Sequence, residues 1–303
     1  ALPQFINRKL FQQKKLHAVI DCSYGPTSVT IPSILSDLKI DVIAINSYES
    51  DRKSTEVFPN LRSIKNCVNI VKAASADLGV ILDADGSRAV FVDETGYLLT
   101  YEELMMFFMS YEENIKKSKG NTIVTSDSSS RVLEQFTEQQ GYKLLKSSNY
   151  PGEISRTIRE ERALFGGADT YKYYFPQYGP FSDATFTTLK ILEVLASQNA
   201  PLSSLIRTFP RTIHAYKTLQ VKSDIINSLT LDLKRLLREI KEPNLDYQDI
   251  LLGMKLYLKE QGWVIIMPSL HSNSIELTAE GNDSSKAEEL IKYAENLLAP
   301  LVK

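Results

Sequence analysis

Short apolar runs alternate with amphipathic stretches over the first part of the chain. Residues 17–21 form an apolar run of strand length, residues 29–38 have helical spacing, and residues 40–45 form a second apolar run. A strand, a helix and another strand in this order predict a βαβ unit with parallel strands. The apolar positions of residues 3–14 also recur at helical spacing, which predicts a short helix before that unit.

The same order of elements returns later in the chain. Residues 122–125 and 142–145 have strand patterns, and the amphipathic residues 132–140 between them are followed by Gly141, a common helix stop. This repeat predicts an α/β protein with two tandem α/β/α domains, whose sheets are mainly parallel or mixed.

The segment between the two repeats carries its own strand and helix patterns. An apolar run at 78–82 leads into the polar residues 83–88, a second apolar run follows at 89–92, and residues 101–117 have helical spacing. The serine run 126–130 stands between a predicted strand and a predicted helix, so we expect it to cap that helix.

The pattern changes after residues 201–210, which begin and end with proline and predict a linker. The elements predicted beyond it are strands at 215–221, 264–267 and 275–279 and helices at 223–242 and 285–298. Because strands and helices no longer alternate as in the repeats, this region predicts a smaller C-terminal α+β domain. The expected domains are residues 1–97, 98–208 and 209–303.

Composition limits the classes of function. Of 303 residues, 43% are hydrophobic and 24% charged, and no apolar stretch approaches the roughly 18 residues that a membrane span requires. The formal net charge of −2 gives no reason to expect nucleic acid or a membrane as a partner. Two cysteines, Cys22 and Cys67, are too few for a disulfide framework, so we expect a soluble cytoplasmic protein.

Glycine is scarce in this chain. It accounts for 13 of the 303 residues, where about 7% is usual. Loops that cradle phosphate groups are normally rich in glycine because the backbone must approach the ligand closely. The composition therefore disfavours several such loops in one chain.

Three ordered motifs carry a resemblance to a known family: ADLGVILDADGSR at 76–88, FGGADT at 165–170 and GWVIIMPS at 262–269. The chain resembles the phosphoglucomutase/phosphomannomutase family, the α-D-phosphohexomutases, in which these positions hold a metal loop, a sugar loop and a phosphate loop. The resemblance covers the last three of the family's four domains. The first domain, which holds the phosphoserine, has no counterpart here, and natural truncation, a separate subunit or a trimmed chain would each explain this.

The metal loop of the family reads D-G-D-G-D-R, and its three aspartates imply a magnesium site. The corresponding residues here are Asp83, Asp85 and Ser87, followed by Arg88. Magnesium prefers carboxylate oxygens in tight octahedral geometry, so the exchange of one carboxylate for a hydroxyl predicts at most a weak Mg²⁺ site. The alternative is that Asp83 and Asp85 are loop carboxylates that pair with Arg88.

The sugar loop departs further from the family. Ala168 stands where the resemblance calls for a glutamate that accepts hydrogen bonds from sugar hydroxyls, and Tyr171 stands where it calls for glycine. Asp169, Thr170 and Lys172 are what remains of this loop. Because alanine has no acceptor, we expect little phosphosugar binding here.

The phosphate loop has lost the arginine of the family, whose place is taken by Met267. Its glycine and threonine are replaced by Leu270 and His271, so Ser269 and His271 are the polar residues that remain. Loss of arginine removes a bidentate phosphate contact, and a lone histidine is usually an ordinary surface residue. We do not expect strong phosphate binding.

Tyrosines are concentrated after the sugar loop, at Tyr171, Tyr173, Tyr174 and Tyr178. Two interpretations stand: these rings fill the former ligand cleft, or they form a surface for a protein partner, since tyrosine offers a large contact area at low entropic cost. We favour filling.

The erosion of every ligand loop predicts a degenerate homologue without catalytic residues that acts as a scaffold or binds another protein subunit. The alternative is a divergent or split phosphoglucomutase or phosphomannomutase, which the retained Asp83, Asp85 and Arg88 support. A residual sensor of sugar phosphates or metal ions is a third interpretation.

Overall fold

The computed structural model describes residues 5–50, 58, 59, 61–211, 213–240, 244–250, 253–259, 262–269 and 272–302. The backbone divides after Phe209 into two units, Ala1–Phe209 and Pro210–Lys303. Phe209 belongs to the first unit because its ring lies 5.5 Å from that of Phe136 and 6.3 Å from that of Tyr111.

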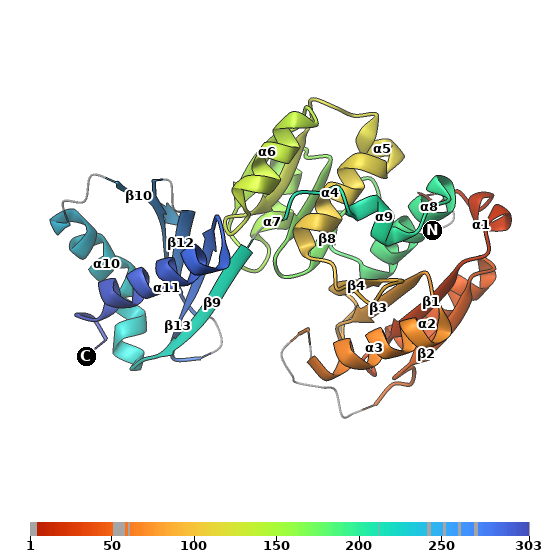
Figure 1. The fold of residues 1–303 in the computed structure, drawn as a ribbon, viewed down its shortest axis with the longest axis horizontal. Coiled ribbons are helices and arrows are strands. Elements are labelled where there is room, and N and C mark those ends of the chain that lie inside the picture. The colour runs from red at the N-terminus through yellow and green to blue at the C-terminus, as the bar shows by residue number, and fades with distance from the viewer. Residues whose placement is uncertain are drawn as a thin grey trace. The chain divides into compact units, whose positions relative to one another are not determined.

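The first repeat folds into a mixed four-stranded sheet in the order β2-β1-β3-β4 (Figure 1). Strand β1 pairs in parallel with β2 and β3, and β4 closes the sheet antiparallel to β3. Strands β3 and β4 are buried along their whole length, as apolar runs covered on both faces should be. The elements are β1 (His17–Asp21), α2 (Thr27–Asp37), β2 (Asp41–Ile45), α3 (Leu61–Ala74), β3 (Leu78–Leu82) and β4 (Ala89–Asp93).

The second repeat reproduces this topology, with the strand order β6-β5-β7-β8. Strand β5 pairs in parallel with β6 and β7, and β8 is antiparallel to β7. The predicted pair of α/β/α domains is therefore confirmed. The elements are α4 (Tyr101–Tyr111), α5 (Glu113–Lys116), β5 (Thr122–Ser126), α6 (Arg131–Gln139), β6 (Lys143–Ser147), α7 (Glu153–Glu160), β7 (Phe165–Ala168), β8 (Lys172–Tyr174) and α8 (Ala184–Gln198).

Helix α8 joins the two repeats into one unit. It contacts β3 of the first sheet and β8 of the second, and residues on all of its sides are buried. Its buried residues include three threonines as well as apolar side chains. Its buried charged side chain, Lys190, lies 2.7 Å from the carboxylate of Glu112 and 2.6 Å from that of Glu193.

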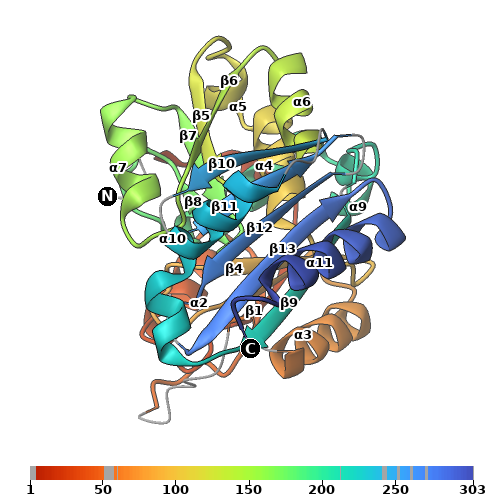
Figure 2. The same cartoon turned by 90° about the vertical axis from the view of Figure 1, so that its left-hand side faces the viewer.

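The second unit is a five-stranded antiparallel sheet in the order β10-β11-β12-β13-β9. Figure 2 shows helices α10 and α11 over one face of this sheet, where alternate strand residues such as Leu256, Val264 and Leu277 form the core with them. This confirms the predicted α+β domain. The elements are β9 (Ile213–Gln220), α10 (Ser223–Glu239), β10 (Leu245–Ile250), β11 (Gly253–Leu258), β12 (Gly262–Pro268), β13 (Ser274–Gly281) and α11 (Ser284–Leu298). In the described part of the chain, no helix is long and apolar enough to cross a membrane.

Three sequence predictions differ from the structure. The helix expected at 3–14 is reduced to α1 (Leu10–Gln13), and residues 3 and 4 lie outside the described residues. The helix expected at 101–117 divides at Glu112, whose backbone is extended and whose carboxylate caps α5 by accepting a hydrogen bond from the Ile115 N–H at 2.8 Å. The expected linker at 201–210 contains α9 (Leu202–Ile206), because its leucines and isoleucine are buried.

Gly25, in the loop after β1, contacts the loop after β3. A Cβ added at Gly25 would lie 2.2 Å from the carbonyl oxygen of Ala84. We therefore expect Gly25→Ala to lower the free energy of unfolding by about 3 kcal/mol, since a backbone atom cannot move aside without shifting its loop. Denaturant unfolding measures this loss.

Gly120→Ala is the matched control. Gly120 has φ +90° but nothing within 4 Å of an added Cβ, so only the conformational cost of about 1 kcal/mol applies. A loss in Gly25→Ala no larger than that in Gly120→Ala would contradict the expected cost of this close contact.

Candidate functional site

Two loops of the first unit meet. Residues 83–88 follow β3 of the first sheet, and residues 169–171 follow β7 of the second sheet. The Ala89 N–H donates a hydrogen bond to the Tyr171 carbonyl at 3.1 Å. The Ser182 hydroxyl donates to the Ser87 carbonyl at 2.6 Å and accepts from the Tyr173 N–H at 3.0 Å. The structure thus brings the predicted metal loop and the predicted sugar loop together.

The carboxylates of the metal loop are bonded within the loop. Asp83 Oδ1 accepts the Arg88 N–H at 2.9 Å, while Asp83 Oδ2 accepts the Ser87 hydroxyl at 3.2 Å and lies 3.6 Å from Arg88 Nε. Asp85 Oδ1 accepts the Ser87 N–H at 2.9 Å. The pairing of Asp83 with Arg88 is therefore present.

The two carboxyl groups ionise differently. Burial and the neighbouring Asp85 raise the pKa of Asp83 above its ordinary range, and the Arg88 N–H only partly opposes this. Burial also disfavours the charged form of Asp85, but hydrogen bonds from Ser87 and the charge of Lys172 outweigh it, so the pKa of Asp85 is lowered. Asp85 is thus the more readily charged member of the pair.

The donors of this loop fit magnesium poorly. Only Asp83 and Asp85 offer carboxylates, and the Ser87 hydroxyl donates a hydrogen bond to Asp83. In the described ranges, no three histidine, cysteine or acidic side chains are grouped so that they could hold a metal ion. An ion bound by both carboxylates would also compete with the Arg88 guanidinium for Asp83.

The sugar loop is a three-residue connection, because Ala168 at the end of β7 pairs with Lys172 at the start of β8. Ala168 is fully buried. Asp169 accepts hydrogen bonds from the Ser128 hydroxyl and the Asn149 side-chain amide. Lys172 is half-buried, and its charge acts on Asp85 in the metal loop. Thr170 is also half-buried.

Tyr171 has a left-handed backbone, with φ +58°. Three-residue hairpin loops commonly place a left-handed residue last, usually glycine, and the resemblance calls for glycine at this position. The Tyr171 ring packs edge-on against Phe58 with centroids 6.4 Å apart. Burial and the charge of Asp169 raise the pKa of this tyrosine.

The interpretation of the tyrosines as a partner surface is wrong for Tyr173 and Tyr174, which are buried with 2% and 9% exposure. Tyr178 is half-buried and stacks on Phe186 at 4.2 Å, and its hydroxyl donates to Asp183 at 3.1 Å. Buried rings cannot present a surface, so Tyr173 and Tyr174 belong to the core of the unit, and Tyr178 packs against that core.

The predicted phosphate loop follows β12 in the second unit. Met267 lies within β12 opposite Glu276, and the Ser269 N–H donates to the Ser274 carbonyl at 2.8 Å. Leu270 and His271 lie outside the described residues. Ser269 is thus the remnant of this loop that the structure places.

One buried carboxylate escaped the sequence analysis. Asp21 ends β1, is fully buried, and accepts hydrogen bonds from the Ser23 N–H and the Asn46 side-chain amide, both at 2.9 Å. Burial, with the charge of Asp21 as a second cause, raises the pKa of Cys22 and Cys67 to about 12. The sequence signal that could have identified Asp21 is an acidic residue at the end of an apolar strand.

Comparisons with known proteins agree with this architecture. Residues 2–96 match the family model "Phosphoglucomutase/phosphomannomutase, alpha/beta/alpha domain II", and residues 101–213 match domain III of the same family. A phosphoglucomutase/phosphomannomutase of Thermococcus kodakarensis is 26% identical over 304 residues, which cover 100% of this chain and 65% of that protein. A Methanopyrus kandleri relative named "Probable phosphoglucosamine mutase" is 25% identical over 91% of this chain and 60% of its own length.

Solved structures share the fold. A phosphoglucomutase/phosphomannomutase family protein of Burkholderia thailandensis superposes with a TM-score of 0.81 at 18% identity, over 99% of this chain and 64% of its own. Parafusin, a phosphoglucomutase of Paramecium, gives 0.79 at 13% identity over 99% and 62%. The chain spans somewhat less than two thirds of the relatives that it matches. With two successive family domains matched, the chain belongs to the phosphoglucomutase/phosphomannomutase family.

Proposed function

We propose that this chain is a non-catalytic member of its family that acts by binding another protein. The observation that carries the proposal is Ala168. A methyl group, fully buried at the end of β7, occupies the position where the resemblance calls for the carboxylate that accepts sugar hydroxyls. A buried methyl group neither accepts a hydrogen bond nor reaches a ligand.

Neighbouring side chains support the same conclusion. Asp169, the nearest carboxylate in the sequence, already accepts two hydrogen bonds from Ser128 and Asn149. Tyr171 places a half-buried ring where glycine would leave room for a ligand. The two free cysteines are buried, which accords with a cytoplasmic location.

A divergent or split mutase, completed by a separate first domain, is the second candidate. The retained residues Asp83, Asp85 and Arg88 favour it. The same residues also favour a sensor of sugar phosphates or metal ions. Phosphoryl transfer depends on positioning and on neutralising the charge of the moving group, so a loop that binds magnesium only weakly contributes little to it.

Exchange into an active relative tests the proposal. This chain replaces the region that it matches in the Thermococcus kodakarensis protein, so that the first domain comes from the relative. We expect turnover of glucose 1-phosphate and mannose 1-phosphate to fall more than about 1,000-fold, since the loss of a single positioned donor can cost 10²–10³-fold. A coupled assay with a hexose 1,6-bisphosphate activator measures it.

The matched control exchanges only residues 168–172 and leaves the rest of the relative intact. It should lose activity while keeping its melting temperature, because the loop is short. Turnover within about tenfold of the parent in either chimera would contradict a non-catalytic role.

Magnesium binding tests the metal loop separately. We expect weak binding by the natural chain and at least about tenfold tighter binding by Ser87→Asp, which supplies a third carboxylate beside Asp83 and Asp85. Titration calorimetry measures both affinities. Ser87→Ala serves as the control and should bind no better than the natural chain; tight binding by the natural chain would overturn the prediction.

A further inference from the structure

A pocket of about 290 Å³ lies on the first unit, bounded by the residues before α1, the junction of α4 with α5, and α8. Phe5, Ile6, Leu10 and Val194 give it an apolar side. Its volume is at the lower end of small-molecule sites and equals that of about ten water molecules. None of its lining residues belongs to the metal, sugar or phosphate loop.

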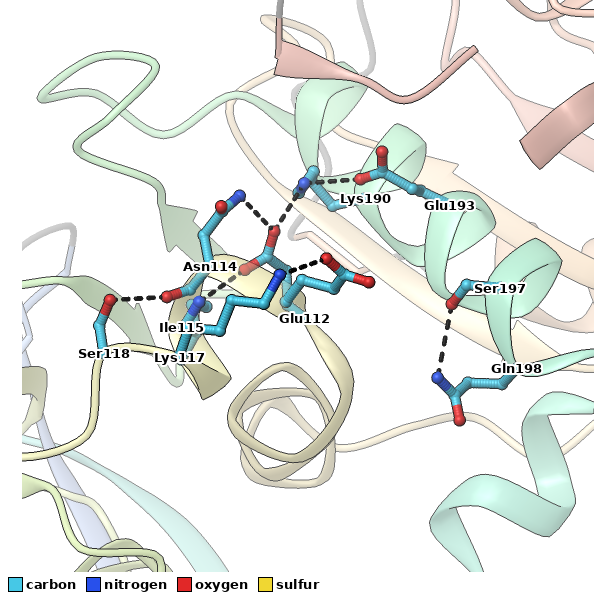
Figure 3. A network of polar contacts seen from close by, with 10 residues as sticks. Glu112, Asn114, Ile115, Lys117, Ser118, Lys190, Glu193, Ser197 and Gln198 are labelled. Atoms are coloured by element: carbon cyan, nitrogen blue, oxygen red, sulfur yellow. Dashed lines mark hydrogen bonds and ion pairs between the residues drawn. The ribbon is translucent and has the colours of Figure 1, made fainter. Parts of the chain in front are cut away.

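A buried group of three charged residues, Glu112, Lys190 and Glu193, lines part of the pocket. Figure 3 shows how their side chains point toward one another. Lys190 Nζ lies 2.7 Å from Glu112 Oε1 and 2.6 Å from Glu193 Oε2. The exposed fractions of the three side chains are 2%, 3% and 13% in sequence order. All three are therefore largely removed from water.

Lys190 stays charged in this group. Burial alone would lower its pKa, but the two carboxylates outweigh burial, so the pKa of Lys190 is raised. Glu112 also accepts hydrogen bonds from the Ile115 N–H at 2.8 Å and the Asn114 amide at 3.1 Å, and Glu193 accepts the Asn7 N–H at 2.6 Å.

The charges do not balance. Two carboxylates and one ammonium leave the group with a net charge of −1, and among the described residues that line the pocket Lys190 is the only base. The remaining acid of the lining, Glu113, is paired at 2.8 Å with the exposed Lys117 outside it. An unbalanced charge that is largely removed from water is costly unless a counter-ion approaches it.

We propose that this pocket binds the protonated amino group of a small aliphatic amine. The ammonium group would lie against Glu193, the most accessible of the three charges, and the aliphatic stem against Leu10 and Val194. The net charge disfavours an anion, because the two carboxylates that pair with Lys190 would repel it. The apolar side distinguishes an organic amine from an inorganic cation, which gains nothing from it.

Calorimetric titration of the full chain with three four-carbon probes tests the proposal: n-butylamine, n-butanol and butyrate. We expect n-butylamine to bind at least about tenfold more tightly than n-butanol, butyrate to give no binding, and sodium or potassium chloride to produce no comparable heat. Equal binding of the amine and the alcohol would overturn the proposal without the need for a variant.

Two substitutions locate the binding. Glu193→Gln makes the group neutral and keeps an oxygen for the Asn7 N–H, so it should weaken n-butylamine about tenfold. Glu113→Gln, on the rim of the same pocket, is the matched control and should leave the affinity unchanged. Unaltered binding by Glu193→Gln, or an equal loss in both variants, would place the amine elsewhere. None of these outcomes bears on the mutase chimeras, so the two proposals fail separately.

Discussion

One buried ion pair ties α8 to the junction of α4 and α5. Lys190 on α8 pairs with Glu112 at that junction, its pair with Glu193 lies within α8, and the same helix contacts both sheets. The start of α8 also contacts the metal loop, since the Ala184 N–H donates a hydrogen bond to the Gly86 carbonyl at 3.0 Å. Removing one partner of a buried ion pair costs about 3–5 kcal/mol, so the geometry of the candidate site depends on charges that lie away from it.

The substitutions at the ligand loops are built into the fold. Ala168 is buried, and its neighbour Asp169 is hydrogen-bonded to side chains from two other loops. Two glycines of the first unit make close contacts between loops: Gly25 approaches Ala84, and a Cβ on Gly86 would lie 2.4 Å from the Thr27 side chain. Glycine is thus retained where the loop after β1 packs against the loop after β3.

Continuous apolar runs made parts of the fold predictable. Strands β1 and β3 begin and end where the pattern placed them, because each run is buried almost throughout. Strand β10 was not predicted, since its four central residues are exposed and polar or aromatic. The division between α4 and α5 at Glu112 was not predicted, because in the sequence a glutamate that caps a helix looks like any other helical glutamate.

The site was predictable only in part. Resemblance located the metal and sugar loops, whereas periodicity contains no information on loops that meet across two sheets. The pairing of Lys190 with Glu112 could not be predicted either, because the two residues lie far apart in the chain and neither stands out from its neighbours in the sequence. Which of the loop residues bind a ligand stays a prediction.

Tyr171 shows how little of a loop's course its side chains decide. An L-residue pays about 1–2 kcal/mol for a left-handed backbone, and this tyrosine keeps it at φ +58°. The path of the chain is set by the pairing of β7 with β8 and by the Ala89 N–H that holds the Tyr171 carbonyl. Because the sheet fixes the course of this connection, a tyrosine can stand at a left-handed position where the resemblance calls for glycine.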